Sequence, residues 1–254
     1  MKNDILSETG KTCFAVVFFI AVLSVVFVSM LEAQVVQDST KADVETFPDS
    51  NSKFIAEASF SFGFGVKNMT VGQTTDNKDV NMSAGGGVGG SLDLYYRISP
   101  FAELGLTGGY QSSSLSVDLK NAKGSFNRGF LLTTIKYGIP VSATGVLKFG
   151  GGIGYYIPGD LDLDMGSVSG GGHNVYSYDG SIGFHLTGEY EIINSPNFSW
   201  GFGMNYYNVS YNLNLVKSNG VTIPINLLPA QVKNDVMKLD GGGIDFSVFI
   251  AFYL

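Results

Sequence analysis

The chain has 254 residues, 34 of them glycine, with 13% aromatic and only 15% charged residues and a net charge of -7 at pH 7. The abundance of aromatic and branched apolar residues excludes a disordered chain, and the acidic balance argues against nucleic acid as a partner. Soluble domains carry about 25% charged residues, so much of this chain's apolar surface needs an environment other than water.

The N-terminal segment predicts export. Residues 14–31 form an uncharged apolar run that follows Lys2 and Lys11. This order is typical of a secretory signal peptide, with cleavage near Ala33, and the run is also long enough to remain as an uncleaved anchor. We predict that residues 1–33 are a cleaved signal peptide.

Residues 34–52 are polar and non-periodic, which predicts a flexible leader. From residue 53 to residue 254, apolar side chains recur at every second position, the period of a β-strand with one apolar face. We predict eight such strands, each of about ten residues. They begin near Lys53, Val88, Ala102, Leu131, Leu147, Tyr178, Phe198 and Ile244.

The connections between the strands alternate in length. Short connections are expected at 99–100, 141–144 and 194–197, and long polar ones at 67–84, 112–127, 158–174 and 210–238. Short turns at one end and long loops at the other predict an all-β, eight-stranded antiparallel up-and-down transmembrane β-barrel over residues 53–254. All seven prolines are expected outside strand interiors, since proline donates no ladder hydrogen bond.

The composition of the two strand faces predicts which face is outside. A soluble barrel would carry many lysines and glutamates on its polar face, but here that face is mostly Gly, Ser and Thr, which fit a narrow lumen. The apolar face is nearly free of charge and carries aromatics such as Tyr96, Tyr137 and Trp200. Such aromatics are typical of a membrane interface, so the apolar face is predicted to contact lipid.

Ten charged side chains are expected to point into the lumen. They are Glu57, Asp93, Glu103, Asp179, Glu189, Glu191, Asp245, Arg97, Lys136 and Lys148. Seven of them are predicted to form a charge network near the short-turn end, with Arg97 directly opposite Glu103: Glu57, Arg97, Glu103, Lys136, Lys148, Glu189 and Glu191. Two interpretations remain open: the network fills the barrel, or it gates a narrow conduit.

The final run, Ile244 to Leu254, ends on a strand, and Gly-aromatic runs such as LKFGGGIGYYIPG precede it. With the signal peptide and the eight alternating strands, this pattern resembles the small bacterial outer-membrane β-barrel proteins, the broad OmpA-barrel, OmpW and opacity-like group. The chain departs from that pattern in ending on Leu254 rather than Phe or Trp. The resemblance implies an outer-membrane location, insertion by the barrel assembly machinery through residues 244–254, and no enzymatic activity.

Three further motifs are similar to known binding or catalytic sites. Gly85–Gly90 matches G-x-G-x-x-G, but a dinucleotide site needs a helix after it, and a strand is expected there. Asp160, Asp162 and Asp164 lack the other ligands of a calcium loop, so an acidic strand-extending face or weak divalent binding remains. His185 stands in a His-Leu-Thr triplet similar to the His-x-Ser of outer-membrane lipid A deacylases, but it is expected in the lumen, away from lipid.

The sequence therefore predicts a non-enzymatic outer-membrane barrel with a structural or surface-interaction role through its long loops. We predict no catalytic residue, no metal and no cofactor, and we expect outer-membrane lipid and lipopolysaccharide as partners. The alternative is a narrow OmpW-like conduit for small or hydrophobic molecules. A lateral opening for such a conduit would need a break in the wall, and only Pro140 is expected near a strand end.

Overall fold

The computed structural model describes residues 52–73, 79–114, 123–165, 172–228, 233 and 236–254. The predicted signal peptide, its cleavage site near Ala33 and residues 34–51 of the predicted leader lie outside these residues. Within the described part of the chain, no helix is long and apolar enough to cross a membrane.

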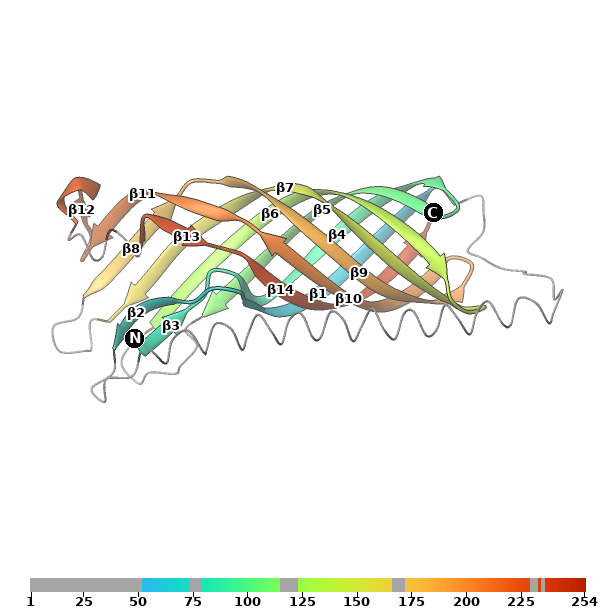
Figure 1. The fold of residues 1–254 in the computed structure, drawn as a ribbon, viewed down its shortest axis with the longest axis horizontal. Coiled ribbons are helices and arrows are strands. Elements are labelled where there is room, and N and C mark those ends of the chain that lie inside the picture. The colour runs from blue at the N-terminus through green and yellow to red at the C-terminus, as the bar shows by residue number, and fades with distance from the viewer. Residues whose placement is uncertain (1–51, 74–78, 115–122, 166–171, 229–232, 234–235) are drawn as a thin grey trace, which may run out of the picture.

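Eight antiparallel strands close into a barrel, as predicted (Figure 1). β1 pairs with β14, which joins the two ends of the described chain, and β7 pairs with β9, which closes the ring. The eight strands are β1 (Phe54–Gly65), β4 (Gly86–Ser99), β5 (Ala102–Ser114), β6 (Lys123–Pro140), β7 (Gly145–Asp164), β9 (Ser181–Ser195), β10 (Phe198–Asn208) and β14 (Gly243–Tyr253). Closure leaves no unpaired sheet edge in the ring, which a sheet in hydrocarbon requires.

The barrel wall continues beyond the ring at the end away from the short turns, which we call the long-loop end (Figure 1). β8 pairs with the last residues of β7, and β11 pairs with β8, β12 and β13. The elements outside the ring are β2 (Met69–Gln73), β3 (Asp79–Met82), β8 (His173–Tyr178), β11 (Ser210–Ser218), β12 (Val221–Ile223), the 3-10 turn η1 (Ile225–Leu227) and β13 (Lys238–Asp240). The predicted long polar connections are thus partly strand.

The acidic triplet shows why the strands are longer than expected. Leu161 and Leu163 are buried, whereas Asp160 and Asp164 are exposed, so the two-residue period continues to the end of β7. The triplet is therefore the strand-extending acidic face that the sequence allowed.

One predicted strand changes phase in its course. Tyr178 was expected on the lipid face and Asp179 in the lumen, but Tyr178 is buried and Asp179 is exposed. The strand is interrupted at Asp179 and Gly180, and the interruption shifts the alternation by one residue before Ile182. Because side-chain direction has a period of two, a one-residue shift reverses the two faces.

The expectation that all prolines avoid strand interiors is wrong for Pro158, which lies within β7. The structure accommodates it at an irregular place in the wall. The β6–β7 register shifts between Phe126 and Arg128, beside Pro158. On the other side, the ladder with β9 ends at Tyr156 and the ladder with β8 begins at Asp160. Pro158 therefore interrupts no continuous ladder with β8 or β9.

The apolar strand faces point outward, as predicted. On β9, for example, Ile182 is 74% and Leu186 54% exposed. The outward apolar run from Ile182 to Ile192 rises about 25 Å at ~3.3 Å per residue and a tilt of about 40°, the height of a lipid-facing band. Above it on the neighbouring β10 and β11, the outward side chains become polar, beginning with Asn208 and Asn212.

Apolar side chains inside the barrel form two clusters. The short-turn cluster consists of Ile55, Tyr95, Phe249, Ala251 and Tyr253. The larger long-loop cluster consists of Met82, Ala84, Phe126, Tyr156, Leu161, Leu163, Tyr176, Tyr178, Tyr207, Val209, Tyr211, Leu213, Val216, Val236 and Leu239. Charged and hydroxylated side chains occupy the interior between them.

Candidate functional site

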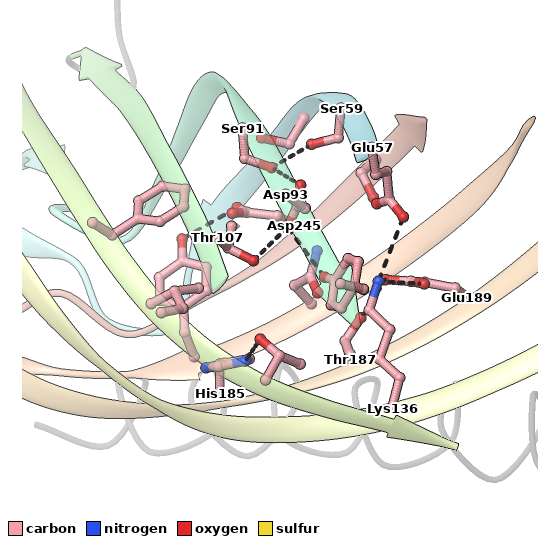
Figure 2. Close-up of a pocket in the computed structure, with 18 of the residues that line it drawn as sticks. Glu57, Ser59, Ser91, Asp93, Thr107, Lys136, His185, Thr187, Glu189 and Asp245 are labelled. Carbon is pink, nitrogen blue, oxygen red and sulfur yellow. Dashed lines mark hydrogen bonds and ion pairs between the residues drawn. The ribbon is translucent and has the colours of Figure 1, made fainter. Parts of the chain in front are cut away.

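The first ion-pair group of the lumen is centred on Lys136, whose side chain is 1% exposed. Its Nζ lies 2.7 Å from Glu189 Oε1 and 3.6 Å from Glu57 Oε2. The three side chains come from β6, β9 and β1, so the ion pairs cross the lumen rather than joining neighbouring strands (Figure 2). Lys136 Nζ also lies 4.0 Å from the centre of the Tyr95 ring, a cation–π contact.

The second group is centred on Lys148 of β7. Its Nζ lies 2.9 Å from Glu103 Oε1 and 2.9 Å from Glu191 Oε2. The hydroxyls of Ser199 and Tyr253 both donate to Glu191 Oε1. A buried ion pair is stable only when its remaining polar atoms are also satisfied, and these hydroxyls satisfy Glu191.

Arg97 does not join either group. It lies opposite Glu103 in the β4–β5 register, as expected. Its guanidinium carbon, however, lies 5.2 Å from the centre of the Tyr253 ring, and Glu103 pairs with Lys148 instead. The expected Arg97–Glu103 pair is therefore absent because a lysine reaches Glu103 from across the lumen. The structure brings the other six predicted residues together, and their functional role remains a prediction.

A third polar group lies toward the long-loop end, and of its charged residues the sequence predicted the inward direction of Asp245 but missed Arg128. Arg128 is 2% exposed, and its guanidinium donates to the Gly241 carbonyl at 2.7 Å and to Gln111 Oε1. It lies over the Tyr207 ring, 4.0 Å from the ring centre. Gln111 Nε2 and the Tyr207 hydroxyl donate to Asp245 at 2.9 Å and 3.1 Å. Continuing the alternation of β6 back from Lys136 by eight residues would have placed Arg128 in the lumen.

A chamber of about 70 Å³ lies between the Lys136 group and the Arg128 group (Figure 2). Glu57, Lys136 and Glu189 line it on one side and Arg128, Tyr156, Tyr207 and Asp245 on the other. A buried water needs about 10–15 Å³, so the chamber has room for about five. Its wall is rich in hydroxyls, including those of Ser59, Ser91, Thr107, Thr134 and Thr187.

His185 lines the chamber and is buried, as predicted. Its Nε2 lies 2.9 Å from Thr134 Oγ1, while Thr187 donates to Glu189 at 3.1 Å. A nucleophile–histidine–acid arrangement needs each pair in contact, and His185 and Thr187 have separate partners. Residues 86–90 of the glycine-rich motif form the start of strand β4, and Gly86 and Gly87 have φ values of 90° and 110°, which explains glycine at both positions.

No family model matches the chain. No curated protein matches it either.

Solved structures similar to this chain include an outer-membrane protein. The outer membrane protein OprG from Pseudomonas aeruginosa is 11% identical, with a TM-score of 0.53 over 80% of this chain and 96% of OprG. Neisserial surface protein A is 12% identical, with a TM-score of 0.45 over 79% of this chain and 97% of that protein. Ail, the attachment invasion locus protein of Yersinia pestis, is 11% identical, with a TM-score of 0.40 over 80% and 97%. At such identities the likeness to OprG establishes a shared fold, the small eight-stranded outer-membrane barrel.

Proposed function

We propose that this chain is a non-enzymatic barrel of the bacterial outer membrane with a structural or surface-interaction role, exercised at its long-loop end. The occupied interior carries this proposal. Two ion-pair groups, the Arg128 group and the long-loop cluster lie inside the barrel, and a chamber of about 70 Å³ lies among them. Side chains that occupy much of the interior of an eight-stranded barrel support a structural or surface-interaction role rather than passage of molecules through a pore.

The outer surface supports the proposed location. The outward apolar band has the height of a membrane barrel, and past it the outward residues at the end of β10 and on β11 are polar, such as Asn208 and Asn212. We propose that the band contacts outer-membrane lipid and lipopolysaccharide. Insertion would use the barrel assembly machinery, which would recognise the C-terminal strand Ile244 to Leu254.

Epitope tags test the proposed orientation. A tag between Asn219 and Gly220, in the tight turn from β11 to β12, should be stained on intact cells. A tag at residue 142, in the short turn between β6 and β7, should be stained only after the outer membrane is opened. The reverse pattern, or staining of neither tag in cells that contain the folded barrel, would contradict the proposal.

Planar bilayers test whether the lumen conducts. The purified barrel should give no stepwise conductance, and Arg97→Ala should behave like wild type, because Arg97 lies outside both ion-pair groups. Stable conductance steps in wild type would favour the conduit.

A second experiment tests the surface role. Residues 221–228 are replaced by a short Gly-Ser linker, and cells that express this variant are compared with cells that express wild type for binding to immobilised extracellular-matrix proteins. Equal binding by the two strains, and by cells without the barrel, would contradict that role for this segment.

A narrow conduit for small or hydrophobic molecules is the second candidate, and one observation favours it. Pro158 lies beside the place where the β7 ladder passes from β9 to β8, so the wall is irregular there. Tyr178 is buried next to this place, and its ring lies 6.5 Å from that of Phe126. A conduit through the wall predicts that Tyr178→Ala speeds entry of toluene into liposomes containing the barrel. An unchanged rate would reject this route.

A further inference from the structure

The chamber contains an unusual pairing of like charges. Glu57 of β1 and Asp93 of β4 lie directly opposite each other in the register and both line the chamber (Figure 2). Side chains in such positions have Cβ atoms about 5 Å apart, and like charges there repel. Both residues are buried, at 7% and 8% exposure, so water screens this repulsion poorly.

Nearby bases compensate this pair incompletely. Lys136 is 2.7 Å from Glu189 but 3.6 Å from Glu57, and Glu57 has no other polar partner among the described residues. Asp93 accepts only from hydroxyls, those of Ser91 at 2.9 Å, Tyr95 at 3.1 Å and Thr107. No base contacts Asp93 within the described part of the chain.

The whole chamber has the same excess of negative charge. Four acids line it, Glu57, Asp93, Glu189 and Asp245, against the two bases Lys136 and Arg128. Uncompensated buried charge is costly, so a carboxylate in this position must gain a counter-ion or a proton. Three other buried polar atoms on residues that line the chamber have no hydrogen-bond partner among the described residues: His185 Nδ1, Arg128 Nε and the Tyr156 hydroxyl. These groups need a partner inside the chamber.

We propose that the chamber binds one small monovalent cation, of the size of Na⁺ or K⁺, between Glu57 and Asp93. The surrounding ligands are carboxylate and hydroxyl oxygens, which hard cations prefer. Lys136 already contacts Glu57, so a single additional positive charge balances this pair of acids. The remaining volume holds a few waters that pair with His185 and Tyr156.

The test compares cations during refolding in detergent. The full barrel is refolded at equal ionic strength in NaCl, KCl or choline chloride, since choline is too large for the chamber. Thermal unfolding followed by circular dichroism should have a higher midpoint in Na⁺ or K⁺, by about 3–6 °C when the cation is near ten times its dissociation constant.

Asp93→Asn should abolish the difference between cations, and Glu57→Gln should reduce it. Asp160→Asn is the matched control, because it removes an exposed acid from the outer face of β7 and should leave the difference unchanged. If Asp93→Asn does not refold, Glu57→Gln is decisive. Equal midpoints in all three salts would overturn the proposal and show that a proton or water alone satisfies the pair. A difference that survives Asp93→Asn or Glu57→Gln in full would also overturn it, because the cation would then bind elsewhere.

Discussion

The ring of Tyr95 lies against Gly105 directly across the β4–β5 pair. A Cβ atom at residue 105 would come within 2.1 Å of the ring carbon Cδ1 of Tyr95. The same ring is the surface on which the Lys136 ammonium rests, 4.0 Å from its centre. A glycine in the barrel wall thus determines where an aromatic ring lies, and the ring in turn positions a buried base.

Gly105→Ala is therefore expected to lower the unfolding free energy by about 1–3 kcal/mol, because the added methyl overpacks the lumen and displaces Tyr95. Urea unfolding of the barrel in detergent measures this change. Gly108→Ala, three residues along the same strand, is the control, since a Cβ there meets no atom within 4 Å. If Gly105→Ala and Gly108→Ala lower the unfolding free energy equally, the position of the Tyr95 ring does not depend on glycine at residue 105.

Lys136→Met is expected to cost about 3–5 kcal/mol at neutral pH, because Glu57 and Glu189 then lose their buried ammonium partner. The loss should shrink as the pH falls, since a buried carboxyl group that is protonated needs no counter-charge. Urea unfolding at a series of pH values checks both the size and the direction of the effect.

Lys123→Met provides the comparison on the same strand, because Lys123 is exposed at the other end of β6. Its effect should stay within about 0.5 kcal/mol. A loss for Lys136→Met that grows toward low pH would contradict the assignment of Lys136 as the counter-charge of the two acids.

Tyr253→Phe removes one of the two hydroxyls that donate to Glu191 and is expected to cost about 1 kcal/mol. Ser199 remains as the other donor, so the ion pair with Lys148 should persist. Tyr96→Phe alters a hydroxyl on a ring that is 43% exposed on the outer wall, and it should be nearly neutral. If Tyr253→Phe and Tyr96→Phe have the same unfolding free energy, the result would argue against the contact between Tyr253 and Glu191.

The alternation of side chains predicts the barrel and its lipid face because each depends on the local two-residue period. Leu104 and Leu106 alternate with Glu103 and Gly105, and the structure places them as that pattern requires. The same period separates Tyr95 from Tyr96, although both are aromatic: Tyr95 is buried inside the barrel and Tyr96 is 43% exposed on the outer wall.

The prediction fails at Asp179 and Gly180, where the strand is interrupted. Nothing in the sequence alone shows that the strand loses its phase there, because the apolar residues on both sides fit one continuous pattern. The sequence pattern of single strands also does not predict which side chains form ion pairs across the lumen. Lys148 of β7 reaches Glu103 of β5 only because the closed ring brings alternate strands together, whereas the register pairs Glu103 with Arg97 and Lys136.

Arg128→Lys tests whether a buried base needs a planar guanidinium at the long-loop side. Arg128 donates to both the Gly241 carbonyl and Gln111 while lying over Tyr207, a combination that one ammonium on a flexible stem reproduces poorly. We expect a loss of about 1–3 kcal/mol in unfolding free energy, with the charge itself conserved. Arg97→Lys is the matched control, since Arg97 also lies over a tyrosine ring but is only half-buried, and it should lose less than about 0.5 kcal/mol. Similar losses in both variants would mean that the cation–π contact, rather than the two hydrogen bonds, accounts for the arginine at residue 128.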